Sequence, residues 1–135
     1  MNICGIELKS NNAILSVIKI EKEKINFLNT KVKKIILENE EDKNSLLKFQ
    51  DEIDNYLEQH KVEKIALKKR AKKGTFAGSS VTFKSEAIIQ LNTICDVTFV
   101  TPQAINKYTK NNEIELPNEL NKYQEQAYFS SLLLV

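Results

Sequence analysis

Cysteine, glycine and proline are scarce in this sequence of 135 residues, which holds 2 Cys, 3 Gly and 2 Pro. Two cysteines inside apolar segments do not make a disulfide framework, so we expect reduced thiols and a cytoplasmic protein. An apolar run long enough to span a bilayer is also missing, which argues against a membrane partner. Repeats and low-complexity tracts are absent as well. We therefore expect one domain over residues 1–135.

Histidine is almost absent too, since His60 is the only one. It falls at the end of an acidic helical segment, where an electrostatic capping role is favoured over that of a catalytic base. The serines that stand out, Ser79 and Ser80, have no histidine partner that the sequence supports. Cys4 and Cys95 are interpreted as core residues rather than nucleophiles.

The charges that are present are segregated along the chain, although the net charge is only +2. Acidic residues dominate residues 38–58, whereas residues 61–73 hold seven basic residues and the single acid Glu63. A basic segment of this kind indicates an anionic partner more strongly than the net charge does.

The first third of the chain is predicted to form three strands, over Asn2–Lys9, Ala13–Ile20 and Ile25–Leu37. Short polar turns join them, so they form an antiparallel meander. The period then changes to three or four residues, which predicts an amphipathic helix over Lys43–His60.

The remaining two thirds alternate strands and helices. Strands are predicted at Val62–Lys68 and Asp96–Val100, with a helix from Val81 to about Ile94 between them. Thr101 and Pro102 are a strong helix start, and this helix runs to about Lys110. A last helix is predicted from Pro117 or Asn118, carrying Leu120, Tyr123, Ala127 and Leu134 on one side.

This order predicts an α/β fold of the ribonuclease-H-like class. The expected sheet is mixed and five-stranded, a three-strand antiparallel meander followed by two parallel strands, with helices on both faces.

The loop after the fourth predicted strand, KKRAKKGTFAGSS, combines features of a phosphate-binding site. Its glycines allow close backbone approach, and a serine can cap the next helix, whose N-terminus favours anions. Ligands of open α/β sheets bind beyond the carboxyl ends of strands. A solvated charge run with a helix-capping serine is the alternative. The candidate binding residues are Lys68, Lys69, Arg70, Lys72, Lys73, Gly74, Phe76, Gly78, Ser79 and Ser80.

Two stretches carry a family resemblance. Cys4-Gly5-Ile6-Glu7 resembles the first strand of the RuvC and YqgF resolvase group. The run from Lys68 to Glu86, with Ala87 to Leu91 after it, resembles a bacterial family known as domain of unknown function 3010, which is grouped with the ribonuclease-H-like fold. This similarity extends over nearly the whole chain, including Thr101-Pro102 and residues 124–127.

The resemblance implies carboxylates on the first strand, on the strand after the first helix and on the last helix, where nucleases of this fold hold two divalent cations. Glu7 and Glu125 fit two of these places as catalytic and metal-binding residues. Lys68 occupies a third place, where it would repel a cation and could form an ion pair with Glu7. We expect no cofactor, and Mg²⁺ or Mn²⁺ only if the protein is a nuclease.

Three hypotheses follow. The first is a degenerate, non-cutting protein that binds nucleic acid or another phosphate-containing ligand through residues 68–80. The second is a metal-dependent nuclease or resolvase. The third is a protein-interaction module, in which the basic loop pairs with the acidic segment of residues 38–58 in a homodimer or with a protein partner. Whether the chain is an enzyme is left open.

Overall fold

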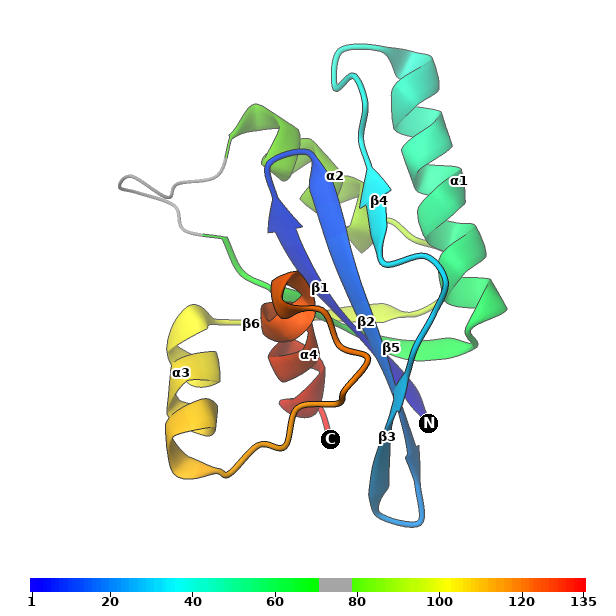
Figure 1. Ribbon diagram of the computed structural model, residues 1–135. Helices are drawn as coiled ribbons and strands as arrows, with labels where there is room; N and C mark the ends of the chain where they lie inside the picture. Colours follow the sequence, from blue (N-terminus) through cyan, green and yellow to red (C-terminus); the bar gives the residue numbers. More distant parts are fainter. Residues whose placement is uncertain (71–78) are drawn as a thin grey trace.

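The computed structural model describes residues 1–70 and 79–135, and this part of the chain forms one mixed α/β sheet flanked by helices (Figure 1). The strands are β1 (Asn2–Lys9), β2 (Asn12–Glu21), β3 (Lys24–Leu28), β4 (Lys34–Ile36), β5 (Val62–Lys68) and β6 (Asp96–Val100). The helices are α1 (Lys43–Gln59), α2 (Ser80–Gln90), α3 (Pro102–Asn111), the 3₁₀ helix η1 (Lys122–Gln124) and α4 (Glu125–Leu132).

The sheet follows the order β3-β2-β1-β5-β6, and β4 also pairs with β2. β1 lies antiparallel to β2 and parallel to β5, and β5 lies parallel to β6. The carboxyl ends of β1, β5 and β6 therefore meet at one edge, because parallel strands end on the same side. The predicted ribonuclease-H-like arrangement of a meander and parallel strands is confirmed.

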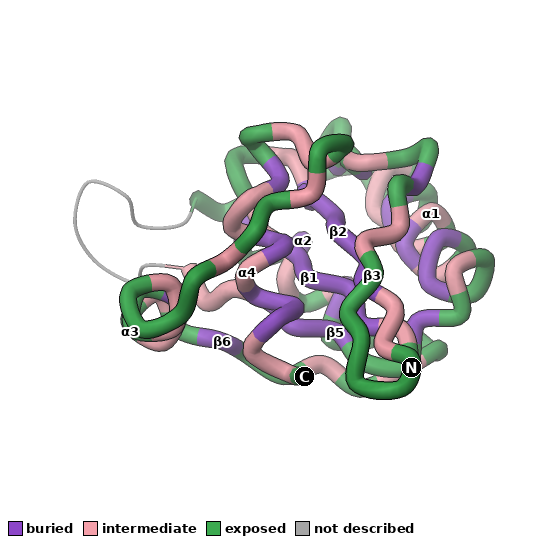
Figure 2. The backbone as a smooth tube through the Cα atoms, turned by 60° about the horizontal axis from the view of Figure 1, so that its bottom comes forward, coloured by how far each residue is buried: buried purple, intermediate pink, exposed green. Residues whose placement is uncertain are grey.

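Helices cover both faces of the sheet, as predicted, because β1 and β5 are apolar on both faces. On one face, Cys4 and Ile6 pack with the α1 residues Phe49 and Ile53. On the other face, Ile3 packs with the α4 residues that cover it. The buried backbone in Figure 2 runs through the central strands between these two layers.

The predicted third strand is wrong in one respect, because it is broken into β3 and β4, which gives the described part of the chain six strands rather than five. Both pieces pair with β2. Between them the chain turns inward at Thr30, whose hydroxyl lies 3.0 Å from the Tyr56 hydroxyl of α1 and donates to the carbonyl of Val32. A buried hydroxyl needs such partners, so this pairing interrupts the strand.

The predicted start of the last helix is also wrong. Residues 117–120 form a turn instead, closed by a hydrogen bond from the Leu120 amide to the Pro117 carbonyl. The helical segment starts after Asn121, which forms a capping box with Gln124. The buried Gln124 amide then donates to the Leu15 carbonyl of β2 at 2.9 Å, which fixes the start of α4 against the sheet.

The other predicted elements agree closely with the structure. β5 and β6 have the predicted bounds, and Thr101 caps α3 by accepting a hydrogen bond from the Ala104 amide. α2 ends at Gln90, earlier than predicted, because the Asn92 side chain accepts the amides of Ile94 and Cys95 in a turn. Within residues 1–70 and 79–135, every helix is too short or too polar to cross a membrane.

Candidate nucleic-acid interface

Glu7 and Lys68 meet at the carboxyl edge of the sheet. They belong to the neighbouring parallel strands β1 and β5, and the Lys68 ammonium donates to the Glu7 carboxylate at 3.2 Å. Both side chains are largely buried, with exposed fractions of 21% for Lys68 and 17% for Glu7. The ion pair that the sequence suggested is therefore formed. It compensates a carboxylate that would be costly to bury alone.

The donor set around Glu7 does not fit a two-metal centre. Glu125 starts α4 and is partly buried. In the described ranges 1–70 and 79–135, no group of three or more His, Cys, Asp or Glu side chains is close enough together to hold a metal ion. Divalent cations such as Mg²⁺ need several converging oxygen ligands. At Glu7 the adjacent group is instead the Lys68 ammonium.

Arg70, a predicted phosphate ligand, is engaged by α2. Its guanidinium lies 3.7 Å from the centre of the Phe83 ring and 3.5 Å from the Glu86 carboxylate. Stacking and charge pairing both favour holding the guanidinium in place. Arg70 is therefore held against α2 in this structure, and its predicted role in phosphate binding stays a prediction.

The two serines at the start of α2 differ from their predicted capping role. Ser79 occupies the N-cap position, but its side chain does not bond to the helix backbone; its hydroxyl lies 3.2 Å from that of Thr82. The Ser80 hydroxyl donates to the Glu40 carboxylate at 2.9 Å, and the Lys84 ammonium donates to the Glu40 carbonyl at 2.7 Å. The Glu40 carboxylate thus lies beside the N-terminus of α2, where we predicted that phosphate would bind.

The rest of the loop falls mainly on residues outside the described ranges. The predictions for Lys72, Lys73, Gly74, Phe76 and Gly78 all lie there, and they stay predictions. The residue before Arg70, Lys69, is described: its amide donates to the Val100 carbonyl at 2.7 Å. This bond places the beginning of the loop beside the end of β6, next to the first turn of α3.

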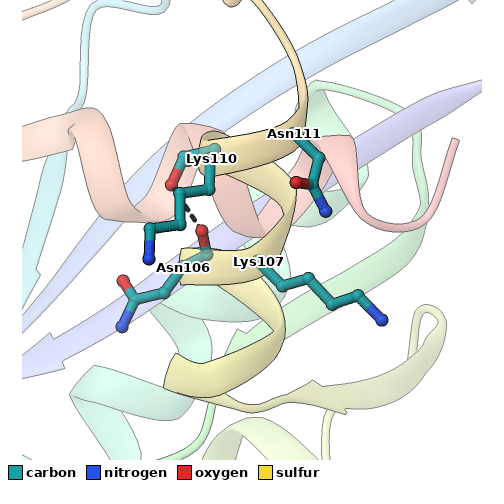
Figure 3. A pocket seen from close by; sticks show the side chains of 5 residues that line it. Asn106, Lys107, Lys110 and Asn111 are labelled. Atoms are coloured by element: carbon teal, nitrogen blue, oxygen red, sulfur yellow. Dashed lines mark hydrogen bonds between the residues drawn. The ribbon is translucent and has the colours of Figure 1, made fainter.

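Sequence reasoning missed the basic face of α3. This helix contains Lys107 and Lys110, and its sequence, PQAINKYTKN, contains no acidic residue. Together with Asn106, Thr109 and Asn111, the two lysines line a surface pocket. Figure 3 shows their side chains diverging rather than converging on one point. Such a surface suits the successive phosphates of a polymer better than a single small anion. The signal in the sequence was a helix with bases and amides but no acids.

The other candidate nucleophiles and bases are Cys4, which is buried, and Cys95 and His60, which are partly buried. Burial raises the pKa of the Cys4 thiol, and burial, followed by Asp96 and Asp54, raises the pKa of Cys95 to about 11. Neither thiol is a good nucleophile, because the thiolate is the reactive form. Burial also lowers the pKa of His60, whose ring packs against Tyr56. His60 does end α1, but a neutral ring does not supply the charge of the predicted electrostatic cap.

A family model described as "Protein of unknown function (DUF3010)" matches residues 1–133. The chain belongs to this family. The predicted membership is therefore confirmed over almost the entire DUF3010 chain. It matches no curated protein sequence.

Solved structures similar to this DUF3010 protein include Holliday junction resolvases. Thermus thermophilus RuvC aligns with a TM-score of 0.65 at 11% identity, over 98% of this chain and 92% of RuvC. RuvC in complex with Holliday junction substrate aligns with a TM-score of 0.61 at 11% identity, over 98% and 90% of the two chains. Fowlpox virus resolvase with substrate Holliday junction DNA aligns with a TM-score of 0.59 at 14% identity, over 99% and 96%. At these identities the likeness concerns the fold, which is resolvase-like.

Proposed function

We propose that this protein binds the phosphate backbone of nucleic acids on a resolvase-like scaffold, without a divalent metal and without cutting the strand. The observation that carries the proposal is the 3.2 Å ion pair between Lys68 and Glu7. The Lys68 ammonium, bound to the Glu7 carboxylate of β1, supplies positive charge at the place where a nuclease of this fold would need a metal ion. The carboxylate is thereby neutralised and does not repel phosphate.

The proposed binding surface lies at the carboxyl edge of the sheet and continues onto α3. Lys69 follows β5 at this edge, and the predicted ligands Lys72 and Lys73 come next in the sequence. The exposed amines of Lys107 and Lys110 extend the basic surface along α3. Contacts of this kind address phosphates rather than bases, so we expect weak sequence preference and strong salt dependence.

Two of the similar structures support the choice of ligand, since they are complexes of RuvC and of the fowlpox virus resolvase with Holliday junctions. By analogy we propose DNA, and branched DNA in particular, as the first ligand to test. Both cysteines are free, which fits the cytoplasmic location that we propose.

Loop substitutions test the proposed surface. In fluorescence anisotropy titrations of labelled duplex and four-way DNA, we expect Lys72→Glu/Lys73→Glu to weaken binding by at least roughly tenfold, because each contact neutralises a phosphate. For a protein that neutralises about four phosphates, raising monovalent salt from about 50 to about 200 mM should lower wild-type affinity on the order of 100-fold.

The double variant Lys22→Glu/Lys24→Glu is a matched control. It changes the net charge equally, but it lies at the β2–β3 turn, at the opposite end of the sheet from the carboxyl ends of β1 and β5. Its affinity should stay close to that of the wild type. Equal loss in both double variants would mean a net-charge effect, and absence of binding at low salt would refute the proposal. Salt-sensitive self-association without DNA would favour the protein-interaction module.

Glu40 should weaken binding, because its carboxylate lies beside the N-terminus of α2. Replacing it with glutamine keeps a hydrogen-bond acceptor for Ser80 and removes the negative charge. We expect Glu40→Gln to tighten DNA binding about two- to fivefold at low salt, an effect that fades as salt screens it. Glu58→Gln, an exposed acid at the far end of α1, serves as the control and should change affinity little. An affinity unchanged by Glu40→Gln would place the bound DNA away from this helix end.

A further inference from the structure

α2 carries a stripe of apolar residues on the side that it turns to solvent. Phe83 and Leu91, one turn on either side of the exposed Ala87, have exposed fractions of 44% and 70%. The opposite face already packs into the molecule through Thr82, Ser85 and Ile89. The solvent side of a surface helix is normally polar. A stripe of exposed apolar side chains on that side of α2 is therefore a candidate contact surface.

The apolar surface extends beyond the helix. Ile94, in the turn after α2, and Phe99, on the outermost described strand β6, are 36% and 37% exposed. α2 packs against β6, the strand that carries Phe99. We call Phe83, Ala87, Leu91, Ile94 and Phe99 the α2 surface. Its large side chains present roughly 350 Å² per molecule, taking about 200 Å² for a whole aromatic side chain.

We propose that the α2 surface binds a second copy of this chain through an antiparallel α2–α2 pair centred on Ala87. With the two-fold axis at Ala87, the antiparallel arrangement places residues equally distant from Ala87 opposite each other, so Phe83 of one copy lies beside Leu91 of the other. The small Ala87 at the centre lets the two helices approach closely. An isologous contact needs a surface that is complementary to itself, and this large-small-large pattern meets that requirement.

The size of the surface fits a dimer. A stable interface buries about 800 Å² per partner, of which somewhat more than half is apolar. The apolar side chains of the α2 surface supply most of that apolar share. Phe83 is also held in place from behind, since the Arg70 guanidinium stacks on its ring at 3.7 Å. A fixed aromatic side chain loses little entropy when a partner packs on it.

The charges permit the same pairing. Among the exposed residues of α2, all within the described range, Lys84 carries the only charge, and its ammonium is bonded to the Glu40 carbonyl at 2.7 Å. Glu86 is turned toward Arg70. In the antiparallel pair, Lys84 of one copy faces Gln90 of the other, because the two residues lie three positions on either side of Ala87. Like charges therefore do not face each other across the contact.

Sedimentation velocity of the full chain tests the proposal. We expect the wild type to sediment at twice the monomer mass at tens of micromolar, also at about 0.5 M salt, since apolar contacts are not screened. Leu91→Glu should produce monomers, because it places two charges in the contact. Leu47→Glu, at a residue of α1 that is 45% exposed, should remain dimeric. A monomeric wild type, or a dimeric Leu91→Glu, would overturn the proposal.

A cysteine pair at the axis gives a second readout that does not depend on destabilising the dimer. In a Cys95→Ser background, which leaves the buried Cys4, Ala87→Cys should form a covalent dimer on mild oxidation. Lys107→Cys, on α3, should stay monomeric on a non-reducing gel under the same conditions. Equal cross-linking of both variants would mean random collision and would contradict the assigned axis. Neither readout involves nucleic acid, so these experiments test the proposed dimer independently of the proposed nucleic-acid binding.

Discussion

Replacing Gly5 by alanine should unfold much of the protein at temperatures where the wild type is folded. Gly5 lies in the middle of β1, directly under α4, and a Cβ atom built on it overlaps the carbonyl oxygen of Ala127 and touches the amide nitrogen of Ser131. These are backbone atoms of a helix, so no side-chain rotation relieves the overlap. The helix must move away from the sheet, or β1 must shift.

The expected cost of this change is large because α4 carries the core of one face. Tyr128 and Leu132 pack there on Ile3 and Ile18. Overpacking of a tight core commonly costs about 1–3 kcal/mol, and displacement of a helix adds to it, so we expect about 4 kcal/mol. Thermal unfolding followed by circular dichroism measures the effect as a fall in Tm of more than about 10 °C.

Ser16→Ala is the control for Gly5→Ala. Ser16 pairs with Gly5 across β1 and β2, and its buried hydroxyl has no hydrogen-bond partner among the described residues. Removing an unpartnered hydroxyl should be neutral or slightly stabilising. If Gly5→Ala lowered Tm by only a degree or two, the close contact between β1 and α4 would be wrong.

Replacing Lys68 by glutamate should destabilise the protein at neutral pH and create a dependence on divalent cations. The change puts a second carboxylate beside Glu7 in a mostly buried position, where the ammonium now lies at 3.2 Å. Loss of the attraction and addition of the repulsion should cost about 2–4 kcal/mol. Mn²⁺ at millimolar concentration should recover much of this loss, because two carboxylates can share a cation. The Tm of the wild type should not respond to Mn²⁺.

Lys69→Glu is the matched control for Lys68→Glu, since it makes the same change of charge at the next residue. It should stay within about 0.5 kcal/mol of the wild type and should not respond to Mn²⁺. Equal behaviour of the two variants, or a Lys68→Glu protein as stable as the wild type without metal, would contradict the role assigned to the ion pair.

The Lys68–Glu7 contact could be predicted from sequence because it depends on topology. Once β1 and β5 are identified as neighbouring parallel strands, the residues near their carboxyl ends must lie close together. The bounds of β5 and β6 were predictable for a related reason, since each is a short apolar segment between clear helix signals. Patterns that are local, or that follow from strand order, can be read directly.

Contacts between distant side chains could not be predicted in this way. The third strand breaks because Thr30 pairs with Tyr56 on α1, and no local turn signal marks that place. The last helix starts late because the Asn121–Gln124 capping box and the bond to Leu15 prevail over the helix signal at Pro117. In each case a specific tertiary bond decided between two plausible local structures.

The prediction for the basic loop of residues 68–80 was limited for the same reason. The composition of the loop predicts anion binding, but it does not show which basic side chains are engaged in contacts within the protein. Arg70 is held by Phe83 and Glu86, and Glu40 approaches Ser80 from forty residues away. The lysines of α3 were overlooked because each is unremarkable in the sequence, although the helix itself was predicted, and the fold shows that this helix begins beside the end of β6.

The most direct test of the central claim is DNA binding with and without divalent cations. Anisotropy titrations of a labelled four-way junction in EDTA and in Mn²⁺, at matched ionic strength, should give the same Kd within about twofold. The recovered DNA should run uncut on a denaturing gel. Binding that requires Mn²⁺, or cleavage products that disappear in Glu7→Ala, would contradict the account and identify the protein as a metal-dependent nuclease.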